Sequence, residues 1–340
     1  MTRKSPVLYL LVSLLAYFGL WIGVPRARFM SAIGTSIESA MRHAHQPLAT
    51  ILPILGIIVF TIPTIAFMAA QIAVVYFFTK TRWGFKGGLL WLVACLIGLT
   101  AMVALMVSRI GFVDKIHRMP NIPEIISIVG LFQPSLLGML MSGVILLTGA
   151  SIGYLVSLRI KDKNLLVPVV MFAASIDFWT VTQGPVSSMM EKLPEITNAI
   201  STPIPQAGTG SFVPLVMMGI GDPLFMAVVF AAVHRLGMNG RRNFWFVFVI
   251  MTLAMLLVLV GLVPYLPALV ALAIAVVAAN WREIRLSKQE KISVAIVGVV
   301  LVLSVFAIGN AFGPTEAAKK KPVPPTTAPV SSPHSPATSK

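Results

Sequence analysis

Long apolar runs alternate with short polar segments along the chain. Nine of these runs approach or exceed the roughly 20 residues that a helix needs to cross a bilayer core about 30 Å thick. We therefore predict about nine transmembrane helices, at Pro6–Val24, Ile51–Phe78, Gly87–Val107, Leu136–Leu158, Leu165–Thr182, Phe212–Val233, Phe244–Leu262, Tyr265–Ala279 and Ile292–Phe312. The pattern indicates an all-α, polytopic membrane protein, because helices satisfy their own backbone hydrogen bonds within lipid.

The polar segments divide the chain into three parts. Residues 1–158 hold four predicted spans and form an N-terminal scaffold, and residues 159–312 hold the remaining five. The tail at 313–340 is rich in Pro, Ser and Thr, a composition that predicts disorder. Between the fifth and sixth spans, residues 184–211 make the longest internal polar loop.

Composition supports the membrane assignment. Hydrophobic residues make up 57% of the chain and charged residues 11%, whereas a soluble globular domain has about 25% charged residues. The net charge of +15 could point to nucleic acid, but the Lys and Arg residues lie in short clusters between apolar runs, as the positive-inside rule describes. We therefore expect no nucleic-acid partner. The single cysteine, Cys95, excludes a disulfide framework or a cysteine metal cluster.

The basic residues set the predicted orientation. With a cytoplasmic N-terminus, fifteen fall on the inside: Arg3, Lys4, Lys80, Arg82, Lys86, Arg159, Lys161, Lys163, Arg235, Arg241, Arg242, Arg282, Arg285, Lys288 and Lys291. Seven fall outside: Arg26, Arg28, Arg42, Arg109, Lys115, Arg118 and Lys192. This excess predicts a cytoplasmic N-terminus. The short, loop-poor chain suggests a multi-pass protein of a prokaryotic cytoplasmic membrane.

Two of the eleven acidic residues lie inside apolar spans. Asp177 lies twelve residues after Leu165, about 18 Å from the inner face, and Asp222 lies ten after Phe212, about 15 Å from the outer face. Both carboxyl groups are therefore predicted near the midplane. A charge at that depth costs a few kcal/mol on insertion scales, and such residues commonly serve a function.

Two carboxyl groups that face each other in a low dielectric share one proton, because both cannot ionise cheaply. Aspartic proteases use this arrangement: the ionised group takes a proton from water, and the protonated group donates to the scissile carbonyl. Asp177 and Asp222 therefore predict aspartyl protease chemistry without a metal or a cofactor. The competing interpretation is structural: Asp222 before Pro223 fits a helix N-cap, and Asp177 could be a lone buried acid.

Other protease chemistries lack their residues. The sequence has no His-Glu-x-x-His motif for zinc, and its five histidines lie in loops, at a span end or in the tail. A Ser–His pair within the membrane is therefore unsupported. Gly208-Thr209-Gly210-Ser211 is more typical of a flexible linker than of a nucleophile elbow.

Three motifs together resemble one known family. Gly219-Ile220-Gly221-Asp222 is similar to the Gly-x-Gly-Asp motif of the presenilin and signal peptide peptidase family of intramembrane aspartyl proteases. Asp177 stands one span earlier, where that family keeps its other catalytic aspartate. Pro267-Ala268-Leu269 is similar to the family's Pro-Ala-Leu motif, and 45 residues separate each landmark from the next. The resemblance covers about residues 160–282 and suggests a prokaryotic-like member.

The sequence also departs from the family pattern. Ile176 stands where the family usually has Tyr, Val270 where a Pro often follows the Pro-Ala-Leu motif, and Pro223 directly follows the second aspartate. Four spans precede the Asp177 span instead of five, and one extra span follows at the end. With the 184–211 loop outside, the active-site helices have the orientation of signal peptide peptidases rather than presenilins.

The resemblance implies an intramembrane endopeptidase that hydrolyses peptide bonds within transmembrane helices or signal peptides. These substrates and the lipid bilayer are the partners it implies, with no cofactor and no metal. Gly219 and Gly221 remove side chains beside Asp222, so that a substrate backbone can approach. Pro267, Ala268 and Leu269 are implied to form a pliable lip that shapes the site. The 184–211 loop is expected to gate substrate entry or to pair with an extended substrate.

A second class of function uses the same features. Proton- or ion-coupled transporters also carry membrane-embedded Asp residues and helices broken by Gly and Pro. A transporter should pair such helices between two halves, and the first half of this chain has no embedded charge. A prepilin-peptidase-like enzyme also shares the Gly-x-Gly-Asp chemistry, but the substrate-binding features it would need are absent from the sequence.

Overall fold

The computed structural model describes residues 5–27, 48–111, 119–182, 201–205, 214–259 and 267–284, together with the isolated residues 288, 292, 298 and 299. The predicted tail at 313–340 lies outside the described residues, as does the predicted ninth span at Ile292–Phe312 apart from three isolated positions.

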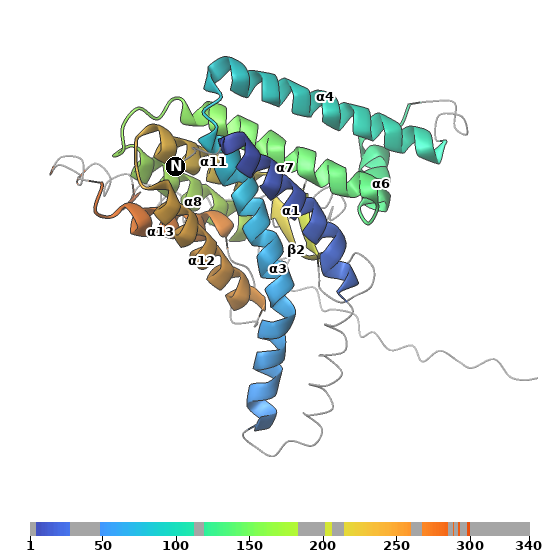
Figure 1. The fold of residues 1–340 in the computed structure, drawn as a ribbon, viewed down its shortest axis with the longest axis horizontal. Helices are drawn as coiled ribbons and strands as arrows, with labels where there is room; N and C mark the ends of the chain where they lie inside the picture. The colour runs from blue at the N-terminus through green and yellow to red at the C-terminus, as the bar shows by residue number, and fades with distance from the viewer. Residues whose placement is uncertain are drawn as a thin grey trace, which may run out of the picture.

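The described chain is mostly helical, with one short hairpin of two strands (Figure 1). In chain order the elements are α1 (Pro6–Arg26), α3 (Leu48–Lys80), α4 (Gly84–Ile110), α6 (Ile122–Phe132), α7 (Leu136–Ser157), α8 (Leu166–Thr182), β1 (Ser201–Pro205), β2 (Pro214–Gly219), α11 (Gly221–Arg235), α12 (Gly240–Leu259) and α13 (Ala268–Asn280). In Figure 1, α8, α12 and α13 lie on one side of the bundle, and α4 and α6 lie on the other.

Within the described ranges, five helices are long and apolar enough to cross a membrane: α1, the Thr61–Lys80 part of α3, α4, α7 and α12. These five correspond to the predicted first, second, third, fourth and seventh spans. The chain is therefore a membrane-embedded helical protein. The helices α8 and α13 are apolar but shorter, with 17 and 13 residues. The total of nine spans stays a prediction.

The predicted helix at Phe212–Val233 is wrong in its first half. Residues Pro214–Gly219 form β2, which pairs antiparallel with β1 so that Ser201 lies opposite Gly219 and Ile204 opposite Val216. The helix α11 begins only at Gly221. A short apolar run bounded by Pro and Gly fits a strand as well as a helix, and here the pairing partner decides between them.

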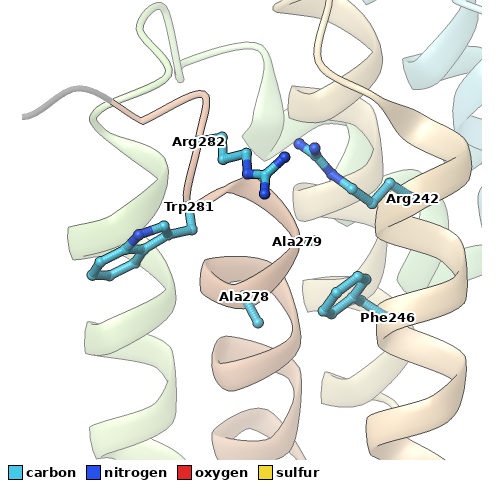
Figure 2. Close-up of a pocket in the computed structure, with 6 residues that line it drawn as sticks. All are labelled: Arg242, Phe246, Ala278, Ala279, Trp281 and Arg282. Carbon is cyan, nitrogen blue, oxygen red and sulfur yellow. The ribbon is translucent and has the colours of Figure 1, made fainter.

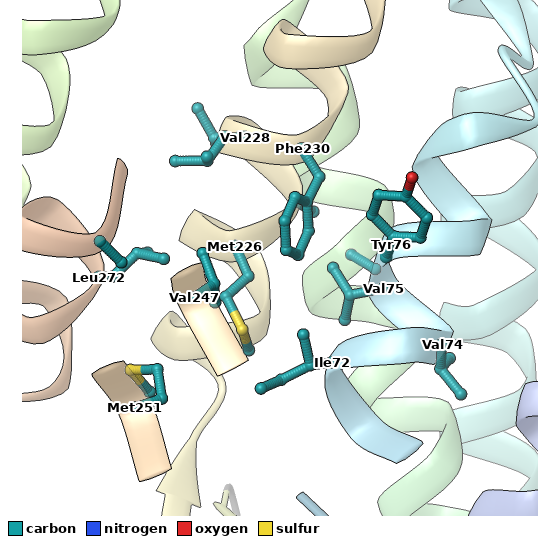
Figure 3. Packing of buried hydrophobic residues seen from close by; sticks show 14 of the residues in the cluster. Ile72, Val74, Val75, Tyr76, Met226, Val228, Phe230, Val247, Met251 and Leu272 are labelled. Atoms are coloured by element: carbon teal, nitrogen blue, oxygen red, sulfur yellow. The ribbon is translucent and has the colours of Figure 1, made fainter. Parts of the chain in front are cut away.

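The core of the bundle is centred on α11. All eight residues from Met226 to Val233 are buried, because α3, α7 and α12 surround this helix. Figure 3 shows Met226 and Phe230 of α11 packed among side chains of α3 and α12. A helix that is hydrophobic on every side, as this one is, belongs inside a bundle rather than at its surface.

Basic residues gather where one set of helix ends meets, a region that we call the basic end. Arg82, after α3, donates a hydrogen bond to the carbonyl oxygen of His234 at 2.8 Å. Arg235, at the end of α11, donates to the carbonyl oxygen of Ser157 at 2.6 Å. The end of α3 is thus tied to the end of α11, and α11 to the end of α7. These bonds give the three helices a common level from which depth can be counted.

Candidate active site

Asp177 makes a hydrogen bond to the start of α13. Its Oδ2 atom accepts from the backbone N–H of Leu269 at 2.8 Å, although the two residues are 92 positions apart in sequence. Leu269 is the third residue of the Pro267-Ala268-Leu269 motif. The structure therefore brings two of the three sequence landmarks into direct contact.

The sequence at the start of α13 explains why this contact forms. Pro267 is the N-cap, and as a proline it has no side chain that can accept a hydrogen bond from the first turn. The first N–H groups of a helix have no partner within the helix, and they carry the positive end of its dipole. In this apolar setting a carboxylate from α8 satisfies one of them. The Pro-Ala-Leu motif is thus capped by Asp177.

Asp222 lies in the first turn of α11. Ile220 is the N-cap of that helix, so the alternative interpretation of Asp222 as an N-cap is wrong. The Asp222 carboxyl group interacts electrostatically with Asp177 and with the backbone of Gly219. Pro223 is buried in the same first turn, where a missing N–H costs nothing. The proline that departs from the family pattern is therefore compatible with the helix.

Counting along α8, α11 and α13 from their ends nearest the basic end gives similar lengths for the three site residues. At about 1.5 Å per residue, Asp222 lies about 20 Å from Arg235 along α11, and Asp177 about 17 Å from Leu166 along α8. Leu269 lies about 17 Å from Asn280 along α13. The sequence-based depth of Asp222 assumes a helix from Phe212, whereas residues Pro214–Gly219 form β2. The length counted along α11 from Arg235 does not depend on that assumption, and it is close to the length counted for Asp177 along α8.

An apolar cluster of side chains from α8, α11 and α13 lies between the carboxyl groups and the basic end. Ala173 lies one turn before Asp177, and Phe225 lies three residues after Asp222, so both carboxyl groups are on the side of the cluster away from the basic end. The free space in the cluster is about 10 Å³, no more than one water molecule needs. The cluster is formed by Val169, Val170, Ala173, Phe225, Val228, Val229, Leu269, Leu272 and Ala273.

Two glycines of α7 hold the turn that carries Asp222. A Cβ atom on Gly149 would lie 3.0 Å from the carbonyl oxygen of Ile220 and 3.2 Å from Cγ of Pro223. A Cβ atom on Gly153 would overlap the carbonyl oxygen of Leu224. The α7 and α11 backbones approach this closely only because both positions lack a side chain. Sequence reasoning missed these residues, although Gly149-x-x-x-Gly153 in an apolar run is a known signal for close helix packing.

The hairpin leads directly into the Asp222 turn. The Thr202 hydroxyl group of β1 donates a hydrogen bond to the carbonyl oxygen of Met218 at 3.2 Å. The Thr64 hydroxyl group of α3 donates a hydrogen bond to the carbonyl oxygen of Pro205, also at 3.2 Å. The strand β1 packs against α1, α3 and α7, whereas β2 contacts β1 and the start of α11. Prolines 203 and 205 lack the N–H groups that would otherwise need partners in this apolar setting.

Open space lies beside both motif glycines. Apart from the chain neighbours, no heavy atom of the described residues would lie within 4 Å of a Cβ atom built on Gly219 or Gly221. These two glycines therefore play a different role from Gly149 and Gly153: they are not needed to pack the described chain. The space beside them is available to another backbone.

Among the described residues, no group of three His, Cys, Asp or Glu side chains could hold a metal ion.

The fold is that of a helical membrane protein, and its candidate site holds two carboxyl groups, those of Asp177 and Asp222. Comparison with models of protein families, with curated proteins and with solved structures finds no significant match to this chain.

Proposed function

We propose that this protein is an intramembrane aspartyl protease in which Asp177 and Asp222 form the catalytic pair. The observation that carries the proposal is the convergence of three distant landmarks. Asp177 bonds the backbone of Leu269, and Phe225, three residues after Asp222, lines one apolar cluster with Ala173 and Leu269. These contacts support a site at which both aspartates and the Pro-Ala-Leu motif converge. A structural role for a lone buried acid does not require this convergence.

In the proposed reaction the pair holds one proton. The ionised carboxylate takes a proton from water while the water oxygen attacks the carbonyl carbon, and the other carboxyl group donates its proton to the carbonyl oxygen. The resulting gem-diol returns a proton to the pair as the C–N bond breaks, and the departing nitrogen receives the other proton. The products are a carboxyl end and an amine end, and the pair again holds one proton.

Substrate binding is proposed along β2 and the motif glycines. An extended peptide can add to a free strand edge through main-chain hydrogen bonds, and among the described residues β2 pairs with β1 alone. The space beside Gly219 and Gly221 would then receive the peptide bond to be cleaved. The proposed substrates are transmembrane helices or signal peptides, locally unwound at this point.

The deciding experiment is cleavage of a reporter transmembrane helix by the purified protein in liposomes. Asp177→Asn and Asp222→Asn should each reduce cleavage at least a thousandfold, because either change removes one of the two proton carriers. Asp162→Asn, which removes an exposed carboxylate after α7, is the matched control and should retain cleavage. A hydroxyl-containing transition-state mimic of aspartic proteases should inhibit the unmodified protein.

Cleavage that survives either substitution would rule out the catalytic pair. The same liposomes, loaded with a pH-sensitive dye, separate the alternative class of function. Proton movement that depends on Asp177 or Asp222, in protein that cleaves nothing, would favour a proton-coupled transporter.

A further inference from the structure

A pocket of about 440 Å³ opens between α12 and α13 at the basic end, far from the carboxyl pair. It is lined by Arg242, Phe246, Ala278, Ala279, Trp281 and Arg282. Figure 2 shows the guanidinium groups of Arg242 and Arg282 near each other at one end, with Phe246 and Ala278 further along the helices. The pocket is thus cationic at one end and apolar along the rest.

The walls of this pocket are held firmly together. Asn243 and Asn280 exchange side-chain hydrogen bonds at 2.8 and 2.6 Å, and both residues are fully buried. Arg242 also forms an ion pair with Glu283. The pocket is therefore built before any ligand arrives, so little ordering would be needed on binding.

Among the described residues, the charge at the mouth of the pocket is not balanced. Glu283 offsets one of the two guanidinium charges, which leaves one positive charge. Within the described ranges Arg282 has no ion-pair partner. Arginine stays charged at all relevant pH values, and its planar fork suits the oxygens of a phosphate. An anion between the two guanidinium groups would complete the charge balance.

The position of the pocket sets it at the membrane surface. Trp281 is 76% exposed and Trp245 is 50% exposed, and tryptophan gathers at the level of lipid headgroups. The apolar part of the pocket runs from the basic end along α12 and α13, past Phe246 and Ala278. A ligand that fits both parts carries a phosphate at one end and a hydrocarbon chain at the other.

We propose that this pocket binds an anionic phospholipid from the surrounding leaflet. Its phosphate lies between Arg242 and Arg282, and one acyl chain follows the groove past Phe246 and Ala278. The unbalanced positive charge selects anionic over zwitterionic headgroups. This site goes beyond the proposed protease function and does not depend on it.

The test uses the full-length protein in liposomes that contain phosphatidylglycerol or phosphatidylcholine with brominated acyl chains, which quench nearby tryptophan fluorescence. Brominated phosphatidylglycerol should quench the Trp281 component more strongly, and Trp281→Phe should remove that component. In Arg282→Gln the apparent affinity for phosphatidylglycerol should fall roughly fivefold. Arg159→Gln, an exposed basic-end change outside the pocket, is the control and should behave as the unmodified protein.

Ala278→Phe provides an independent variant, because it fills the groove while leaving both arginines in place and adds no tryptophan to the fluorescence measurement. It should also weaken quenching by brominated phosphatidylglycerol. Equal quenching by both lipids, or unchanged preference in Arg282→Gln, would overturn the proposal. Displacement of the lipid by millimolar inorganic phosphate would also overturn it, since the site would then hold a free phosphate.

Discussion

At the scale of single residues, the main finding is that Asp177 caps a helix to which it does not belong. Its carboxyl group satisfies the Leu269 N–H, which Pro267 cannot reach with a side chain of its own. The same carboxyl group is proposed to take part in catalysis. The Asp177 side chain thus makes a structural hydrogen bond and also has a proposed catalytic role.

This double role predicts a difference in stability between two substitutions that both remove the charge. Asp177→Asn keeps an oxygen that can accept from Leu269, whereas Asp177→Ala leaves that N–H without a partner in an apolar site. We expect Asp177→Ala to be less stable than Asp177→Asn by about 1–3 kcal/mol, measured by thermal or denaturant unfolding in detergent. Both variants should be inactive. Equal stability of the two would contradict the capping contact.

Gly219 and Gly221 lead to the opposite expectation for stability. Because a Cβ atom on either residue would meet no neighbouring side chain among the described residues, Gly219→Ala and Gly221→Ala should change the unfolding temperature little. They should reduce cleavage at least tenfold, since the added methyl group occupies the space proposed for the substrate. Gly19→Ala on α1, which also has open space around it, is the control and should leave cleavage unchanged.

At the scale of elements, the crossing of α7 and α11 positions the Asp222 turn. The helix α11 has no cap side chain of its own, so its first turn depends on the surface that α7 offers. Gly149 and Gly153 make that surface flat enough for backbone contact. We regard both as positioning residues of the proposed active site.

Gly153→Ala should therefore displace the start of α11. The added Cβ atom would overlap backbone rather than a flexible side chain, so the cost should lie near the upper end of the 1–3 kcal/mol typical of overpacking. A displacement of about 1 Å at a catalytic group can lower activity roughly a hundredfold. We therefore expect Gly153→Ala to lower both the rate of reporter cleavage and the unfolding temperature.

Gly98→Ala on α4 is the matched control for this crossing. Its nearest neighbour, Cγ1 of Val144, would lie at an ordinary 3.9 Å from the new Cβ atom. It should keep both stability and cleavage. Similar losses in the two variants would mean that helical glycines matter here for a reason other than close packing.

The elements also show how far sequence reasoning reaches. Five long apolar runs were identified correctly, because length and composition alone decide whether a helix can span a membrane. The hairpin was missed, because β1 contains two prolines, which usually argue against a strand, and β2 is as apolar as a buried helix. The depth of the two aspartates could be counted, but the contact between Asp177 and Leu269 depends on tertiary packing that spacing does not reveal.

At the scale of the whole molecule, one end of the bundle carries most of the described positive charge. Ten Lys and Arg residues belong to it: Lys80, Arg82, Lys86, Arg159, Lys161, Lys163, Arg235, Arg241, Arg242 and Arg282. Two described basic residues, Arg26 and Arg109, lie at the far ends of α1 and α4. This asymmetry predicts that the basic end faces the cytoplasm.

Cysteine labelling in intact cells tests this orientation. In a Cys95→Ser background, Lys161→Cys at the basic end should react with a membrane-impermeant maleimide only after the membrane is opened. Met119→Cys, near the opposite end and 79% exposed, should react in intact cells. The reverse pattern would place the basic end outside and invert the predicted topology.

The contact between Asp177 and Leu269 also has a consequence for how the protein is made. The ribosome produces Asp177 92 residues before its partner, so α8 is made while its carboxyl group still lacks that hydrogen bond. The Asp177 carboxyl group gains its hydrogen bond only when α13, the last of the three converging helices, has been made. The proposed site is therefore completed late in biosynthesis, because a chain that stops before α13 lacks the helix start that Asp177 caps.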